Sequence, residues 1–315
     1  MIHPNTDVLI TGGNGNLGRL VAQKFLNQGR RVIKFDIPGT EPDVLQDNEI
    51  IISGDVRDTH FLESLIKKYK PDMILHLASL LSGSSEADLS AAWDINATSS
   101  FNLLKLAHEN NVRQLFFAST IATYGAVEID PMPETYPQWP GNLYGVTKVA
   151  VERLGVYFKS KHGLDFRCLR FPLVLSPYAP KTAVTAFPSH AIAAAIKGES
   201  FIFPVSPQTG MSTIFLEDVV ESIFVYNQVS RESLSKHVYN LHAYYLSADL
   251  IVREISRRFV GFECTFELNS AVDQLISGWP GVVDDHDART DWGWSPKFDL
   301  SRSVDRVIEL VARGV

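Results

Sequence analysis

Residues 7–18 read DVLITGGNGNLG, and this stretch decides the fold. A short apolar run passes directly into a glycine-rich turn, and residues with helical apolar spacing follow. A strand–turn–helix of this kind needs glycine where φ is positive, where a pyrophosphate approaches the backbone and where the helix packs on the strand. The start of the helix then offers amide donors to the phosphates. The pattern predicts a dinucleotide site that includes Gly12, Gly15, Asn16, Leu17 and Gly18, with a purely structural turn as the alternative.

The first two-thirds of the chain repeats this alternation of strand and helix. Apolar runs alternate with amphipathic stretches of helical period, which is typical of a parallel sheet covered by helices on both faces. We therefore predict an α/β fold with a doubly wound parallel sheet of the Rossmann type. The predicted strands are 7–10, 31–35, 50–52, 73–76, 114–117 and 166–170, and the predicted helices are 17–28, 59–69, 97–110 and 143–162.

The pattern changes after residue 172. Prolines recur from Pro172 to Pro207, which is typical of loops and short helices. We divide the chain into an NAD-binding Rossmann domain, residues 1–172, and a smaller α+β substrate lobe, mainly residues 173–315. A part of the second region, about 212–242, is expected to return to the main sheet. Strand-like pieces are predicted at 238–241 and 263–267, and a last helix at 300–313.

Two aspartates follow predicted strands at the same edge of the sheet. Asp36 ends the second strand, where a carboxylate accepts hydrogen bonds from both adenosine ribose hydroxyls and repels a 2′-phosphate. This favours NAD over NADP. Asp55, together with Val56, follows the third strand and is a candidate for holding the adenine edge. For both aspartates, a turn or helix cap is the alternative.

Tyr144 and Lys148 stand four residues apart in a predicted helix, so their side chains share one face. A nearby ammonium favours a phenolate and is expected to lower the pKa of Tyr144. Such a phenol suits a general base that takes the proton of an alcohol as hydride leaves. Lys148 can also hydrogen-bond the nicotinamide ribose. The pair therefore predicts the catalytic centre, although this spacing alone also occurs by chance.

Two hydroxyl residues, Ser119 and Thr120, follow the predicted strand at 114–117. At the carboxyl edge of a sheet their hydroxyls are expected to point into the cleft and orient a substrate oxygen towards Tyr144. We predict that Thr120 is catalytic and that Ser119 contacts the substrate. The alternative is a hydroxyl cluster that caps the chain. His76, at the end of another strand, is expected to be a core histidine.

Composition narrows the class of protein. The formal net charge is -7, and the sequence contains no basic stripe of the kind that neutralises nucleic-acid phosphates. No apolar run is long enough for a membrane span, and the chain start has no basic region followed by an apolar one. We therefore expect a cytoplasmic protein without a nucleic-acid or membrane partner. The two cysteines, Cys168 and Cys264, lack metal-ligand spacing, and no metal is predicted.

Together these motifs resemble the extended short-chain dehydrogenase/reductase family, also called the NAD-dependent epimerase/dehydratase family. The resemblance covers nearly the whole chain and, within the family, is strongest to the short-chain type of L-threonine 3-dehydrogenase. The resembling segments are 78–82, 92–96, 119–122, 144–148, 170–172, 278–280 and 284–292. By this resemblance, NAD would also contact Leu77, Ala78, Ser79, Asn96, Tyr144, Lys148, Phe171 and Leu173.

One departure from the family concerns the substrate. Those threonine dehydrogenases carry Thr-Thr-Asp-Tyr where this chain has residues 184–187, Val-Thr-Ala-Phe, so Ala186 replaces a carboxylate. If that carboxylate holds the substrate ammonium, its loss removes roughly 1.5–3 kcal/mol. A hydroxy acid or sugar acid then competes with threonine as the substrate. The predicted substrate contacts are Ser82, Ser119, Thr120, Tyr144 and Thr185, with Lys181 and His190 as candidates for binding a substrate anion.

The predicted activity is hydride transfer from the secondary alcohol of a small polar substrate to NAD. A first rival is a nucleotide-sugar 4-epimerase or dehydratase that uses the same groups on tightly bound NAD, although residues 172–280 show no arginine-rich diphosphate clamp. A second rival is a redox-sensing scaffold without turnover, which the presence of both Tyr144 and Lys148 disfavours. The resemblance also implies a homodimer formed through the helices at 97–110 and 143–162.

Overall fold

Seven parallel strands form the central sheet of the protein. The computed structural model describes residues 7–40, 45–180, 183 and 185–313. The strands lie in the order β10-β6-β5-β4-β1-β2-β3, and every neighbouring pair is parallel. They are β1 (Val8–Thr11), β2 (Val32–Asp36), β3 (Glu49–Ser53), β4 (Met73–His76), β5 (Gln114–Thr120), β6 (Asp165–Phe171) and β10 (Val238–Asn240).

The strand order reverses between β1 and β4. From β1 the chain first builds outwards through β2 and β3, and then returns to add β4 on the other side. In open parallel sheets, ligands bind in the crevice at the carboxyl ends of the strands on either side of such a reversal. The residues that follow β1 and β4 therefore mark the expected cofactor site.

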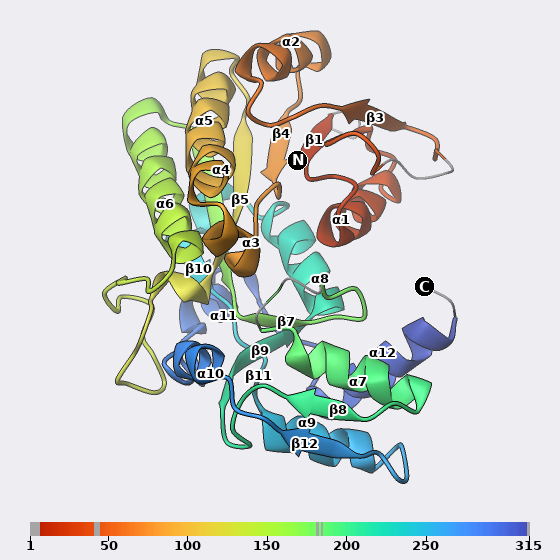
Figure 1. The fold of residues 1–315 in the computed structure, drawn as a ribbon. Helices are drawn as coiled ribbons and strands as arrows, with labels where there is room; N and C mark the ends of the chain where they lie inside the picture. Colours follow the sequence, from red (N-terminus) through yellow and green to blue (C-terminus); the bar gives the residue numbers. More distant parts are fainter. Residues whose placement is uncertain (1–6, 41–44, 181–182, 184, 314–315) are drawn as a thin grey trace.

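Helices cover both faces of this sheet (Figure 1). Strand side chains alternate between the faces, so Ile10 packs in the core with Phe25 and Ile223, whereas Leu9 packs in the core with Leu62 and Val151. Burial on both faces explains why these strands are almost continuously apolar. One face carries α1 (Asn16–Leu26) and α8 (Leu216–Tyr226), and the other carries α2 (Thr59–Tyr69), α5 (Ser99–Glu109) and α6 (Leu143–His162).

The segment between β4 and α5 is less regular. Two short helices, α3 (Ser82–Ala87) and α4 (Leu89–Trp93), lead into a π-helical turn over Asp94–Thr98, and α5 continues from it. Single π-helical turns inside helices are rare and are frequent at functional sites. A 3-10 turn, Ile121–Thr123, follows β5.

A smaller lobe lies beyond the carboxyl ends of the sheet, below it in Figure 1. It has its own apolar core, which includes Phe203, Phe215 and Ile251. Its sheets are β11 (Tyr244–Ser247), β9 (Gly210–Phe215) and β7 (Leu173–Leu175), in that order, and the pair β12 (Cys264–Phe266) with β8 (Phe201–Phe203). The later helices are α7 (Phe187–Lys197), α9 (Ala248–Ser256), α10 (Ser270–Ser277), α11 (His286–Trp292) and α12 (Leu300–Ala312), with a 3-10 turn at Arg231–Ser233.

The predicted α/β fold with a doubly wound parallel sheet is confirmed, with differences at particular elements. β5 runs to Thr120 rather than ending at 117, so the two hydroxyl residues belong to the strand. Within 212–242, α8 and β10 return to the main sheet, whereas residues 212–215 belong to β9 in the small sheet. The sheet β7-β9-β11 was not predicted, because its strands are short and their sequences lack clear alternation.

Candidate functional site

The glycine-rich turn after β1 is too tight for side chains. Gly12 has a φ of +70°, and a Cβ on Gly12 would lie 2.7 Å from the backbone nitrogen of Ala78. A Cβ on Gly18 would lie 2.1 Å from the carbonyl oxygen of Gly12. The first helical turn of α1 therefore rests directly on the backbone of the loop. A Cβ on Gly15, in contrast, would meet a single neighbouring atom, the Gly12 carbonyl oxygen at 3.3 Å, so the outer side of Gly15 is open.

Among the described residues, no side chain caps the start of α1. The N-cap residue is Gly15, which has no side chain to accept a hydrogen bond from the first turn, and that turn contains no acidic residue. The free amide groups and the helix dipole make this position suited to an anion. The residues of this turn therefore fit the diphosphate of a dinucleotide.

Asp36 ends β2 beside this turn. Its carboxylate accepts hydrogen bonds from the backbone N–H groups of Asn14, at 2.9 Å, and Ile37, at 2.8 Å. One carboxylate oxygen binds each donor, so both oxygens keep lone pairs for further donors such as ribose hydroxyls. The position agrees with the predicted role, which stays a prediction.

Asp55 is already engaged by a neighbour. Its carboxylate accepts hydrogen bonds from Arg57, including Nε at 3.0 Å, and this contact lowers the pKa of Asp55. The backbone N–H of Arg57 also donates to it at 2.9 Å, which is the turn-forming arrangement considered as the alternative. Val56 is buried in the core beneath α2. Contact of either residue with an adenine stays a prediction.

The segment after β4 is held by Asn96, from the π-helical turn. The Asn96 side chain accepts a hydrogen bond from the Leu80 N–H at 2.8 Å and donates to the Leu80 carbonyl at 3.0 Å. It also accepts from the Ser79 hydroxyl at 3.1 Å. Asn96 is therefore a buried brace that positions residues 77–80 at the edge of the sheet, next to the glycine turn. Direct contact of Asn96, Leu77, Ala78 or Ser79 with a cofactor stays a prediction.

The helix α6 carries Tyr144 and Lys148 close to the end of β5. Asn142 caps the helix by accepting from the Gly145 N–H at 2.8 Å. Gly145 allows α6 to pack closely against the turn that follows β5, because a Cβ on this residue would lie 2.6 Å from the carbonyl oxygen of Ala122. Lys148 Nζ donates to the carbonyl of Ala118 at 2.8 Å. The helix thus holds the tyrosine and lysine one turn apart against the carboxyl end of β5.

The electrostatics of this pair differ from the sequence-based expectation. Burial raises the pKa of Tyr144 to about 12 rather than lowering it. Burial also lowers the pKa of Lys148 to about 8. The ammonium lies 5.4 Å from the centre of the Tyr144 ring and makes its hydrogen bond to Ala118 instead of the phenol. The expected lowering of the pKa of Tyr144 by Lys148 is therefore wrong for the chain by itself, because burial of the phenol determines the direction of the shift.

The two hydroxyl residues at the end of β5 point to opposite sides, as consecutive strand residues do. Thr120 Oγ1 accepts from the Ala122 N–H at 3.2 Å and its side chain is partly exposed. Ser119 is buried and donates its hydroxyl to Glu152 at 2.5 Å. The expectation that both hydroxyls face the cleft is therefore wrong for Ser119. Substrate contact by Thr120 stays a prediction.

A buried polar network behind this site was not predicted. Glu152 on α6 forms an ion pair with Arg170 on β6, with Nη2 of Arg170 at 2.7 Å. Arg170 also donates to the hydroxyl of Tyr124 at 2.6 Å, and that hydroxyl donates to Asn240 on β10 at 2.9 Å. The spacing of the sequence could have predicted one member of this network. Glu152 follows Lys148 by four residues, so it lies on the same helix face as Tyr144 and Lys148.

The remaining predicted residues come from both the main domain and the smaller lobe. Phe171 and Leu173 are buried in the two cores, and Ser82 begins α3. Thr185 is partly exposed, and Ala186 is the buried N-cap of α7. One turn into α7, His190 Nε2 is buried without a hydrogen-bond partner among the described residues. Lys181 lies outside the described residues.

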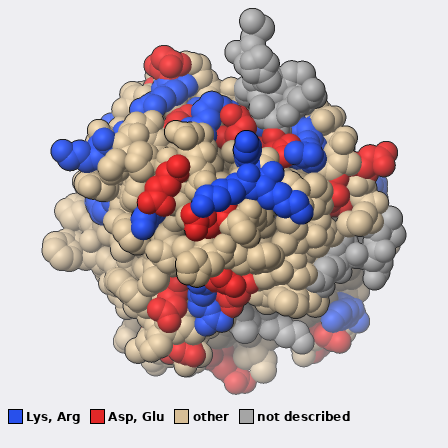
Figure 2. Space-filling model, turned by 90° about the horizontal axis from the view of Figure 1, so that it is seen from above, with Lys and Arg blue, Asp and Glu red and all other residues tan. Residues whose placement is uncertain are grey.

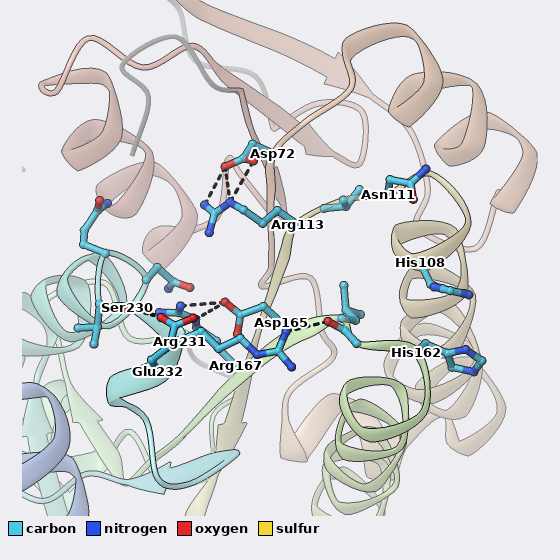
Figure 3. A pocket seen from close by; sticks show the side chains of 16 residues that line it. Asp72, His108, Asn111, Arg113, His162, Asp165, Arg167, Ser230, Arg231 and Glu232 are labelled. Carbon is cyan, nitrogen blue, oxygen red and sulfur yellow. Dashed lines mark hydrogen bonds and ion pairs between the residues drawn. The ribbon is translucent and has the colours of Figure 1, made fainter. Parts of the chain in front are cut away.

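A cavity of about 840 Å³ lies at the opposite, amino edge of the strands, between the ends of α5, α6 and α8 (Figure 3). Two of its acidic groups form ion pairs, Asp72 with Arg113 at 2.7 Å and Asp165 with Arg167 at 2.8 Å. Arg231 donates to the carbonyl of Gly163, just after α6. Basic groups are favoured at helix C-termini, so they need no ligand there. In Figure 2, which looks down on this upper end, basic and acidic groups lie side by side.

No helix in the described part of the chain is long and apolar enough to cross a membrane. Among the same residues, no group of three or more histidine, cysteine, aspartate or glutamate side chains is arranged to hold a metal ion.

Known proteins are similar to this chain in sequence and in fold. The model of the NAD dependent epimerase/dehydratase family matches residues 8–241. The mitochondrial L-threonine 3-dehydrogenase of Bos taurus is 32% identical over 306 residues, which cover 96% of this chain and 81% of that protein. The structure of a monomeric L-threonine 3-dehydrogenase from a metagenome, in its apo form, has a TM-score of 0.89 and 29% identity, covering 97% of this chain and 99% of that chain. The holo form of a GalE-like L-threonine dehydrogenase from Cupriavidus necator has a TM-score of 0.89 and 25% identity, covering 96% of this chain and 99% of that chain.

The doubly wound sheet, the glycine turn and the tyrosine–lysine helix define the class as NAD-dependent oxidoreductases and epimerases. More particularly, the chain belongs to the NAD-dependent epimerase/dehydratase family, the extended short-chain dehydrogenases/reductases, and it is similar to L-threonine 3-dehydrogenases.

Proposed function

We propose that this protein is an NAD-dependent dehydrogenase that oxidises the secondary alcohol of a small polar substrate, either threonine-like or a hydroxy or sugar acid. The observation that carries the proposal is the placement of Tyr144 and Lys148 on α6, with Lys148 bound to Ala118 only two residues before Thr120. The names of the similar proteins, L-threonine 3-dehydrogenases, support the reaction class.

Each polar group at this edge has a role in the proposal. Thr120 binds the alcohol oxygen and holds it near Tyr144, which takes the hydroxyl proton as a general base. Lys148 stabilises the phenolate and hydrogen-bonds the nicotinamide ribose. NAD, when bound, supplies the carbon that accepts the hydride. The glycine turn and the free amides of α1 hold the diphosphate, and Asp36 holds the adenosine ribose, which favours NAD over NADP.

The proposal implies a rise of the oxidation rate with pH. The pKa of Tyr144 in the chain alone is raised to about 12 by burial, so the phenol is protonated at neutral pH. A higher pH increases the fraction of Tyr144 that is phenolate. A positive charge near the phenol lowers its pKa, so the same fraction forms at a lower pH. The oxidation rate should therefore increase with pH until Lys148, whose pKa burial lowers to about 8, loses its proton.

The substrate class depends on residues at the start of α7. Ala186 offers no charge to a substrate ammonium, whereas His190, one turn later, has a ring nitrogen without a partner among the described residues. A hydroxy acid needs no ammonium ligand, and an imidazole N–H can hydrogen-bond its carboxylate. These two positions favour a hydroxy or sugar acid over threonine.

The test is NADH formation, followed by absorbance, with NAD and separately L-threonine, short-chain hydroxy acids, sugar acids and UDP-hexoses. We expect turnover with at least one of the first three groups and a loss of about 100-fold or more in Tyr144→Phe, because a general base contributes roughly that much. Near-normal turnover in Tyr144→Phe contradicts the mechanism. Conversion of a UDP-hexose without net NADH points instead to an epimerase that works on tightly bound NAD. The homodimer stays a prediction, and one similar structure is described as monomeric.

A further inference from the structure

A buried carboxylate lies one helical turn beyond Lys148. Glu152 is 0% exposed, and all its hydrogen bonds are made inside the protein. It accepts from Ser119 Oγ at 2.5 Å, from Arg170 Nε at 2.9 Å and Nη2 at 2.7 Å, and from Gln138 Nε2 at 3.0 Å. An ionised carboxylate is stable in such a place only because Arg170 neutralises it and the other donors satisfy its oxygens.

Glu152 and Lys148 hold consecutive residues of β5. Lys148 Nζ binds the carbonyl of Ala118, and Glu152 binds the hydroxyl of Ser119. Thr120 is the next residue and the last of the strand. Two neighbouring contacts from the helix therefore fix the strand end immediately before Thr120. Because consecutive strand side chains alternate in direction, anchoring Ser119 in the core leaves the Thr120 side chain outside that buried position, where it is partly exposed.

Glu152 also supplies the negative charge near Lys148. Burial lowers the pKa of Lys148, whereas Cys168 and Glu152 raise it. Burial raises the pKa of Cys168 well above its usual range, so its thiol is neutral at physiological pH. Burial lowers the pKa of His76 to about 3, so that ring is uncharged as well. The rings of Phe117 and Tyr144, with centres 4.6 Å and 5.4 Å from the ammonium, carry no charge. Glu152 stands one turn after Lys148 on α6, and the two side chains bind neighbouring residues of β5, so among the described groups Glu152 is the carboxylate whose charge acts on the ammonium.

We propose that Glu152 is a positioning residue for the dehydrogenase reaction: through Ser119 it fixes the end of β5 that carries Thr120, and it places a negative charge behind the Lys148 ammonium. The inference rests on the proposed function, because it uses the roles assigned there to Thr120 and Lys148. A competing explanation is that the Glu152–Arg170 pair only fastens α6 to β6. That explanation predicts lower stability on mutation but no change in the reaction or its pH dependence.

The first test is Ser119→Ala, which keeps the Glu152–Arg170 ion pair and removes only the link to β5. We expect kcat to fall by about ten-fold with a change of less than about two-fold in the KM for NAD, because a misplaced catalytic group lowers the rate more than binding. Ser119→Cys, which restores a weak donor of similar size, should recover part of the loss. A folded Ser119→Ala enzyme with native kcat overturns the positional part of the proposal.

The second test is Glu152→Gln, with Glu63→Gln as the matched control, because Glu63 is a surface residue paired with Lys67 on α2. The readout is the pH dependence of NADH binding, measured by fluorescence titration. Removal of the negative charge disfavours the ammonium, so Lys148 loses its proton at a lower pH. We expect the alkaline midpoint of NADH binding to move down by about one pH unit in Glu152→Gln and to stay unchanged in the control.

An unchanged midpoint in folded Glu152→Gln overturns the electrostatic part of the proposal. If Glu152→Gln does not fold, Ser119→Ala and Ser119→Cys still decide the positional part. If the native protein oxidises no alcohol, the proposed function fails, yet the NADH-binding midpoint still tests Glu152 because that measurement needs no substrate.

Discussion

Gly18→Ala tests whether the glycine turn holds the cofactor. The added methyl carbon would lie 2.1 Å from the carbonyl oxygen of Gly12 and 2.8 Å from the Cα of Gly13. Non-bonded carbon contacts are normally about 3.5–4.0 Å, so the loop must move by roughly 1 Å or more. Both clashing atoms are backbone, and a change of rotamer cannot relieve them. The shift would displace the turn in which we place the diphosphate.

Overpacking of this kind costs about 1–3 kcal/mol. If all of it is expressed in cofactor binding, the affinity for NADH falls by about 5- to 150-fold. The assay is fluorescence titration with NADH, beside urea unfolding to separate binding from stability. The matched control is Gly141→Ala, because a Cβ on Gly141 has no neighbour within 4 Å. NADH affinity equal to that of the native protein in folded Gly18→Ala would refute the reasoning.

Two further predictions concern carboxylates. Asp36→Ser should lower the ratio of NADH affinity to NADPH affinity at least about ten-fold, because a ribose acceptor that repels a 2′-phosphate is removed. Asp55→Asn, whose carboxylate Arg57 already engages, should change this ratio less, and an equal change would contradict the assignment. Burial raises the pKa of Glu134 to about 7, so the folded chain binds this proton more tightly than the unfolded chain. Stability should therefore be lost as the pH rises from about 4.3 to about 7, and Glu134→Gln should be more stable than the native protein by about 1–3 kcal/mol at pH ~8 but by well under about 1 kcal/mol at pH ~4. Urea unfolding at both values checks this, and an equal effect at both would exclude a titration of Glu134.

The elements that the sequence predicts well are those with local physical causes. The runs that became β1, β2 and β4 are apolar because each is buried on both faces, and this leaves a continuous pattern. The glycine turn was visible because its backbone leaves no room for a Cβ at Gly12 or Gly18. The pair Tyr144 and Lys148 was visible because helical spacing alone puts two side chains on one face.

The direction and environment of single side chains depended on the tertiary structure. Ser119 and Thr120 look equivalent in the sequence, yet the extension of β5 through both turns one hydroxyl towards Glu152 and leaves the other partly exposed. The pKa of Tyr144 moved opposite to the expectation, because desolvation depends on everything packed around the phenol.

Long-range pairings were also beyond local reasoning. Glu152 meets Arg170 only because α6 packs across β5 and β6, and Tyr124 meets Asn240 only because β10 returns to the sheet edge. Local spacing in this chain determined the class of fold and the residue types at its cofactor turn and catalytic helix. The packing of distant segments decided which hydroxyl is free, which charge acts on Lys148 and what each pKa becomes, because burial and charge pairing are properties of the assembled core rather than of any one segment.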